Sequence, residues 1–151
     1  MREASFREQV AVVEELLRLV ANVVRKRGRD ILSDFDITPP QFQALLVVAD
    51  EEGITMGELC QRMYLACSTA TDLIDRMEKA GLVSRERDQQ DRRVIRLQVS
   101  PRGHEIMKSV LEARRRYLEG VLAHMDPGEI NALTRSLQQV HQLMSKDMVP
   151  A

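Results

Sequence analysis

Residues 67–103 read CSTATDLIDRMEKAGLVSRERDQQDRRVIRLQVSPRG, and the spacing of their apolar residues changes midway. Up to Gly81 the apolar residues recur every three or four positions, which predicts one helix. Beyond Gly81 they alternate with polar residues, which predicts two strands, 82–87 and 95–99. The polar segment 88–93 contains neither Gly nor Pro, so we expect a longer charged tip rather than a two-residue turn.

A short helix is expected just before this segment. Thr55 and Glu58 have the spacing of a capping box, which marks a helix start. The apolar face of this helix consists of Met56, Leu59, Cys60 and Met63. Residues 64–66 interrupt the pattern, and the helix that follows has a small, polar outer face. Two short helices joined by a tight turn and followed by a charged hairpin predict a winged helix-turn-helix.

The remaining segments are also helical, so the predicted fold class is mainly α with one small β-hairpin. Residues 38–41 (TPPQ) begin a helix whose expected inward stripe is Phe42, Leu45, Leu46 and Ala49. Residues 100–101 (SP) begin a helix that extends to about residue 124, and residues 126–129 (DPGE) begin the last helix.

The first and last helices carry long apolar seams. The first helix, from about residue 6 to residue 32, has one row at Phe6, Val10, Val13, Leu17, Val20 and Val24 and a second at Val12, Leu16, Leu19 and Val23. Such seams need partner surfaces, so the sequence predicts a homodimer with interface residues Val10, Val13, Leu17, Leu133, Leu137, Val140 and Met144. We expect a helical dimerisation region from 1–34 and 104–151, and a winged helix-turn-helix region from 35–103.

The composition excludes several classes of protein. The chain has 151 residues, 44% of them apolar and 30% charged, which is typical of a folded globular domain. The apolar runs are too short to span a membrane and the N-terminus does not resemble a signal peptide, so we expect a cytoplasmic protein without membrane contact. The two cysteines cannot form a secreted disulfide framework. Aromatic residues make up 3%, which disfavours binding of single-stranded nucleic acid by base stacking.

No pattern in the sequence indicates an enzyme. It contains no dinucleotide-binding glycine motif, phosphate-binding loop, metalloprotease motif or nucleophile elbow. The histidines at 104, 124 and 141 lie far apart, without neighbouring residues at metal-ligand spacing. We therefore expect no catalytic residue, no metal site and no cofactor.

The predicted helix-turn-helix carries residues suited to duplex DNA. The net charge of −1 excludes a uniformly basic binder, but residues 82–103 hold six Arg against three acidic residues. Small hydroxyl residues begin the second helix and can reach base edges, and a guanidinium two turns later can reach a phosphate; the four residues are Ser68, Thr69, Thr71 and Arg76. Short polar residues are also common at helix starts for purely structural reasons.

The hairpin tip adds a second candidate contact. Arg92 and Arg93 place two guanidinium groups where a narrow minor groove, with its negative potential, would attract them. Asp91 is expected to accept a hydrogen bond from a nearby arginine and so to orient the wing. The alternative is a charged tip that is simply solvated.

Taken together, these residues resemble the MarR family of bacterial and archaeal transcriptional regulators. The most specific parts are residues 76–83 (RMEKAGLV), residues 87–93 (RDQQDRR) and residues 100–103 (SPRG). The resemblance implies a triangular homodimer in which the first, fifth and sixth helices interleave, a recognition helix at 67–80, and a wing whose Arg93 reaches the minor groove. It also implies a ligand crevice, for which the candidate lining residues are Phe35, Phe42, Leu46, Tyr64 and Met107; ordinary core packing is the alternative for each.

The predicted function is a regulator that binds double-stranded DNA as a homodimer. We expect a repressor of a pseudo-palindromic operator that responds to a small aromatic or anionic ligand. One alternative is a winged-helix module that binds proteins instead of DNA.

A second alternative is a cysteine-based redox sensor. One branch of the family senses oxidants through a cysteine near the start of the first helix, and this chain has none there. Cys67 lies at a helix N-terminus, a position that can make a thiol reactive. We nevertheless expect it to be inert, and we expect Cys60 to be hidden on the apolar face of its helix.

Overall fold

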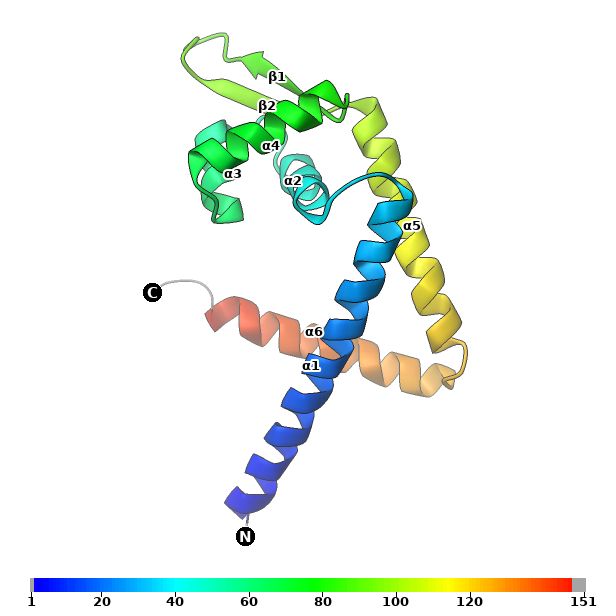
Figure 1. Cartoon of the computed structure of the whole chain (residues 1–151). Coiled ribbons are helices and arrows are strands. Elements are labelled where there is room, and N and C mark those ends of the chain that lie inside the picture. Colours follow the sequence, from blue (N-terminus) through cyan, green and yellow to red (C-terminus); the bar gives the residue numbers. More distant parts are fainter. Residues whose placement is uncertain (1, 148–151) are drawn as a thin grey trace. The chain divides into compact units, whose positions relative to one another are not determined.

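The computed structural model describes residues 2–147 of the chain, and it is mainly helical with one hairpin, as predicted (Figure 1). The elements in order are α1 (Arg2–Asp34), α2 (Pro39–Asp50), α3 (Met56–Met63), α4 (Cys67–Lys79), β1 (Val83–Arg87), β2 (Ile95–Val99), α5 (Pro101–Leu122) and α6 (Pro127–Asp147). The chain divides after Glu112 into two compact units. Within residues 2–147, no helix has the length and apolar character needed to cross a membrane.

The predicted helix starts are confirmed by their capping hydrogen bonds. Before α2, the hydroxyl of Thr38 accepts from the backbone N–H of Gln41 at 3.3 Å, and the Gln41 side chain accepts from the N–H of Thr38 at 3.0 Å. Thr55 and Glu58 form the same reciprocal pair before α3. These bonds satisfy amide groups that a helix N-terminus would otherwise leave unpaired.

The hydrophobic core lies entirely between Leu32 and Val110 among the described residues. α2 runs through its centre and buries Phe42, Ala44, Leu45 and Val48. The predicted inward stripe of this helix was therefore partly wrong, because Leu46 is 37% exposed and Ala49 is only half-buried. α2 packs against α3, α4 and β2 at once, so its buried arc is wider than a one-sided stripe and is centred on other positions.

The hairpin follows α4 through a turn that requires glycine. Gly81 has φ +75°, and its N–H donates to the carbonyl of Glu78 while the N–H of Leu82 donates to the carbonyl of Met77. This is the Schellman arrangement, in which a left-handed residue ends the helix and satisfies its last carbonyls. β1 and β2 then pair antiparallel with Val83 opposite Val99.

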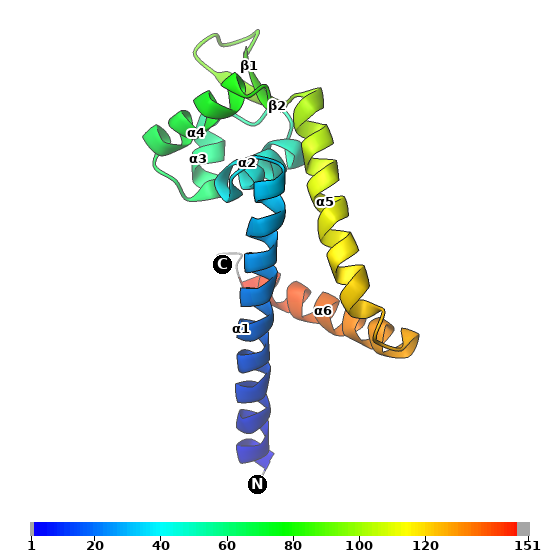
Figure 2. The same ribbon diagram turned by 45° about the vertical axis from the view of Figure 1, so that its right-hand side comes forward.

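The sheet includes a contact that the sequence patterns did not predict. The N–H of Gly53 donates to the carbonyl of Leu97 at 3.0 Å, and the N–H of Leu97 donates to the carbonyl of Ile54 at 2.9 Å. These bonds add the segment before α3 to β2 as an isolated bridge between Thr55 and Arg96. The base of the wing is thereby fixed to the helix-turn-helix, while the tip projects from the lobe (Figures 1 and 2).

α1 contributes only its last turns to the core. Ile31 and Leu32 pack there beside Phe35, which follows the helix, whereas the large apolar residues from Phe6 to Val24 are exposed in the isolated chain. α6 behaves in the same way, since Leu137 and Met144 are 53% and 59% exposed.

Candidate nucleic-acid interface

α4 presents a polar outer face above a fully buried inner one. Ala70, Ile74 and Met77 are each 0% exposed and anchor the helix on the core. The outward residues include the four predicted DNA contacts, and all of them are exposed: Ser68, Thr69, Thr71 and Arg76. A helix held this firmly by one face can present the other face to a groove without changing shape.

The N-terminus of α4 is open to an acceptor. Its N-cap residue, Ala66, forms no side-chain capping bond, so no side chain satisfies the amides of the first turn in this way. Exposed helix N-termini of this kind attract phosphate. Thr71 differs from the expectation in one respect, because its hydroxyl donates to the carbonyl of Cys67 at 2.7 Å and keeps only its acceptor capacity for a base.

The wing tip is organised by Asp91. Its carboxylate accepts from the backbone N–H of Arg93 at 3.1 Å and from the Arg93 guanidinium at 3.1 Å (Nε to Oδ1) and 3.2 Å (Nη2 to Oδ2). These bonds hold the pKa of Asp91 below its usual value. Asp91 thereby orients the Arg93 side chain, which remains accessible because it is 90% exposed.

A second carboxylate, Asp88, supports the base of the same loop. It accepts from the backbone N–H of Gln90 at 3.0 Å and from the Arg96 guanidinium at 3.0 and 3.2 Å, and these bonds lower its pKa. Arg96 also donates to the carbonyl of Gly53 at 2.8 Å. Sequence reasoning missed this clamp, because it joins residues far apart in the chain.

Arg85 attaches the hairpin to α4, and its role was also missed. Its guanidinium pairs with Asp75 at 2.6 Å and with Glu78 at 3.3 Å, and its side chain is only 21% exposed. Strand alternation could have indicated this, because Arg85 shares a face with the buried Val83. These ion pairs of Arg85 fix the position of the wing relative to α4.

Not all of the local positive charge is neutralised. In the described residues of the lobe, Arg76, Arg87 and Arg92 are exposed and have no ion-pair partner. They lie on α4, at the end of β1 and at the wing tip. The surface of the lobe therefore carries exposed guanidinium groups, although the whole chain has a net charge of −1.

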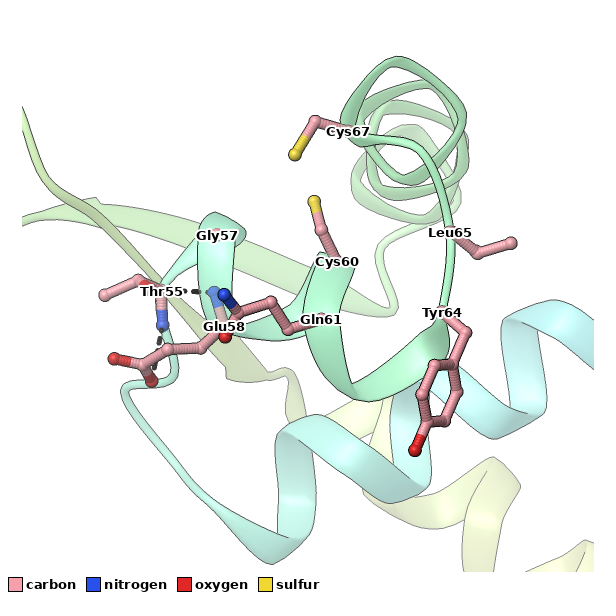
Figure 3. Close-up of a pocket in the computed structure, with 8 residues that line it drawn as sticks. All are labelled: Thr55, Gly57, Glu58, Cys60, Gln61, Tyr64, Leu65 and Cys67. Carbon is pink, nitrogen blue, oxygen red and sulfur yellow. Dashed lines mark hydrogen bonds between the residues drawn. The ribbon is translucent and has the colours of Figure 1, made fainter. Parts of the chain in front are cut away.

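The five candidate ligand residues have different environments. Phe42 is 3% exposed in the core, Phe35 and Met107 pack against it, Leu46 is 37% exposed and Tyr64 is 90% exposed. Tyr64 also lines an open pocket of about 770 Å³ at the α3–α4 corner, together with seven residues not predicted for ligand binding (Figure 3). Those residues are Thr55, Gly57, Glu58, Cys60, Gln61, Leu65 and Cys67.

The predicted dimer residues are all accessible. Their exposed fractions range from 37% at Leu133 to 59% at Met144, and Val10, Val13 and Leu17 line a shallow groove along α1. Within the described part of the chain, no group of three potential ligands could hold a metal ion.

Comparisons with known proteins agree with this architecture. Residues 35–94 match the model of the MarR family. The chain is 42% identical over 139 residues to YsmB of Bacillus subtilis, named an uncharacterized HTH-type transcriptional regulator, and the match covers 92% of this chain and 95% of that protein.

Solved structures give the same result. A MarR family protein from Bacillus stearothermophilus superposes with a TM-score of 0.85 at 45% identity, covering 92% of this chain and 97% of that one. A point mutant of MepR from S. aureus, solved bound to an oligodeoxyribonucleotide, has a TM-score of 0.70 at 16% identity, with coverage of 87% and 97%. At that identity the likeness shows a shared fold.

Proposed function

Because this chain belongs to the MarR family of transcriptional regulators, which are not enzymes, we propose that it binds double-stranded DNA. In this proposal α4 enters the major groove with Ser68, Thr69 and Thr71, while Arg76 contacts a phosphate. Arg93, with Arg92 beside it, enters the adjacent minor groove. The observation that carries the proposal is the pairing of Arg93 with Asp91, which orients an exposed guanidinium at the hairpin tip.

A homodimer completes the proposed binding unit. The exposed apolar seams of α1 and α6 supply the interface, so that regions 1–34 and 104–151 dimerise while region 35–103 contacts DNA. A twofold dimer places its two recognition helices about one helical turn of DNA apart, which corresponds to a pseudo-palindromic site. The oligonucleotide in the related MepR structure supports binding through this fold.

We further infer a ligand-responsive repressor. A small aromatic or anionic effector would bind beside Phe35, Phe42, Leu46, Tyr64 or Met107 and favour a dimer whose lobes are badly spaced for the operator. This part rests on the family resemblance. It is tested by adding a panel of phenolic ligands to the DNA-binding assay described next.

The decisive experiment compares two arginine variants. Fluorescence anisotropy measures binding of the intact protein to DNA from upstream of its own gene, over a series of salt concentrations. Arg93→Ala should weaken binding by roughly 1–3 kcal/mol for each seated wing. Arg116→Ala removes the same charge from an exposed position on α5 that is neither a proposed DNA contact nor one of the predicted dimer-interface residues, and it should leave the affinity unchanged.

Salt and spacing complete this test. Affinity should fall steeply with salt, because bound phosphates release counterions. Inserting about half a helical turn between the half-sites should abolish specific binding. Equal affinities for Arg93→Ala and Arg116→Ala would contradict the assignment of the wing, and no binding to any duplex at low salt would favour a protein-binding module.

A further inference from the structure

The α3–α4 corner brings the only two cysteines of the chain together. Cys60 belongs to α3 and is 5% exposed, whereas Cys67 is the first residue of α4 and is exposed. Their side chains point toward one another from the two helices, with the sulfur atoms foremost, and both line the open pocket (Figure 3). Cys60 is hidden as the sequence indicated, but its thiol borders a pocket and faces a second thiol.

The short connection between the helices keeps the two cysteines close. Only residues 64–66 separate α3 from α4. Tyr64 adopts the left-handed conformation with φ 53°, and its N–H donates to the carbonyl of Gln61, while the N–H of Leu65 donates to the carbonyl of Cys60 at 3.1 Å. These bonds determine the direction of the turn and therefore the position at which Cys67 begins the next helix.

The two thiols differ in their exposure to solvent. Burial raises the pKa of the Cys60 thiol, and its interaction with Cys67 raises it further, so Cys60 is held as the neutral thiol. Cys67 is exposed and can meet a reagent from solution. An exposed thiol beside a buried thiol is the arrangement in which the first is oxidised and the second resolves the product.

Contrary to the expectation from the sequence that Cys67 is inert, we propose that Cys60 and Cys67 form an oxidisable dithiol, which a hydroperoxide converts into a disulfide between α3 and α4. In the first step the Cys67 thiolate attacks the peroxide oxygen, the O–O bond breaks, and the alkoxide leaves and takes a proton to become an alcohol. Cys67 is then a sulfenic acid. In the second step the sulfur of Cys60 attacks the sulfur of Cys67, the S–O bond breaks, and the departing hydroxide combines with the Cys60 proton as water.

A disulfide here would act on the recognition helix. An S–S bond is about 2.05 Å long, so it draws the first residue of α4 toward α3. Ser68 and Thr69 follow Cys67 directly and would move with it. This consequence rests on the proposed function, in which these residues contact DNA, whereas the disulfide itself does not. We expect the oxidised protein to bind its operator at least tenfold more weakly, with recovery after dithiothreitol.

The chemistry is tested on the full chain without DNA. Reduced protein is treated with a stoichiometric amount of cumene hydroperoxide, and its intact mass is measured under denaturing conditions. The wild type should lose two hydrogen atoms and both titratable thiols. Trypsin cleaves after Arg62, between the two cysteines, so their peptides stay joined only if the disulfide has formed.

Two variants separate this site from ordinary oxidation of an exposed thiol. In Cys60→Ala the Cys67 sulfenic acid has no resolving partner, so it should proceed to sulfinic acid, which the wild type should avoid. In Cys67→Ser the buried Cys60 should remain reduced. Sulfinic acid on wild-type Cys67 at the rate seen in Cys60→Ala, or disulfides only between molecules, would overturn the proposal.

The DNA-binding arm distinguishes the two proposals. If the linked peptides form and operator affinity is unchanged, the dithiol is real but the proposed control of α4 is wrong. If the untreated protein binds no duplex while the peptides still link, the proposed function fails and the site remains.

Discussion

The segment from Leu32 to Val110 and the two ends of the chain differ in how far they bury their apolar side chains. In the first, leucine, isoleucine and valine side chains are buried by the chain itself. At the ends, such side chains stay exposed along residues 6–24 and 118–144, and apart from Leu46 and Tyr64 every large exposed apolar residue among those described lies there. Because monomeric soluble proteins rarely expose continuous apolar seams, we propose that a partner covers the ends of the chain, whereas the central lobe buries its own core.

The largest effect on oligomeric state and DNA binding is expected from a charge placed in either apolar seam. Leu137→Asp or Val13→Asp would bury an unpaired carboxylate in the proposed interface, a change that costs several kcal/mol. We expect monomers or unfolding, and operator binding reduced at least a hundredfold. Sedimentation equilibrium and anisotropy measure both effects.

Matched controls make this result specific. Gln138→Asp and Gln9→Asp put the same charge at exposed polar positions on the same two helices and should remain dimeric. A stable, folded wild-type monomer at micromolar concentration would remove the basis of the comparison.

The next test concerns the lobe, where tight packing rather than a partner sets stability. A Cβ added at Gly103 would collide with the carbonyl oxygen of Leu82 and lie 2.7 Å from Cγ1 of Val99. Gly103→Ala should therefore lower the free energy of unfolding by about 1–3 kcal/mol. A Cβ added at Gly120 on the same helix would meet no atom within 4 Å beyond the helix's own backbone in the isolated chain, so Gly120→Ala should raise the free energy of unfolding by about 0.5–1 kcal/mol. Urea denaturation compares them, and equal stabilities would contradict the close packing of α5 on the hairpin.

The same division explains what the sequence could predict. Helix starts such as Thr38 and Thr55, and the Gly81 stop, are local signals, so these boundaries were predicted closely, whereas the first helix begins about four residues earlier than predicted. The ion pairs of Arg85 and Arg96 were not, because they depend on which distant segments meet after folding. The burial expected for Leu46 was wrong for a similar reason, since the sequence of one helix does not show which of its faces the neighbouring elements will cover.

For the cysteine pair, too, the sequence predicted the local features and not the contact across the turn. Periodicity correctly placed Cys60 on a buried face and Cys67 at the start of a helix. It could not show that the turn at 64–66 would point their side chains at one another (Figure 3). Contacts across a turn depend on backbone angles such as that of Tyr64, and a single sequence does not reveal a left-handed tyrosine.

The wing lies within the lobe, but in the proposed function it contacts a partner, as the ends of the chain do. If Asp91 only orients Arg93, Asp91→Asn should weaken operator binding less than Arg93→Ala does, by under about fivefold, since an exposed ion pair contributes little. The free guanidinium can still reach the groove, but it spends less time in the bound geometry. Anisotropy at moderate salt measures the difference. An Asp91→Asn variant as weak as Arg93→Ala would mean that Asp91 does more than position its neighbour.

The smallest expected effect is the response of the wing to acid. Hydrogen bonds from Arg93 lower the pKa of Asp91, and those from Gln90 and Arg96 lower the pKa of Asp88, both from an ordinary value of 3.8. A lowered folded-state pKa means that each carboxylate stabilises the fold fully above the unfolded value, and that this contribution disappears as pH falls through the folded value. The wing should therefore be unchanged from neutral pH down to about pH 4 and loosen only below it.

Carboxyl NMR titration measures this response and should give midpoints below 3.8 for both groups, with the Arg93 Nε–H signal fading as Asp91 is protonated. Asp91→Asn should abolish that change of the Arg93 signal and leave the Asp88 midpoint low. A midpoint at or above 3.8 for Asp91 would show that the exposed pair is broken in solution, and Asp91 would then not orient the Arg93 side chain in the free protein.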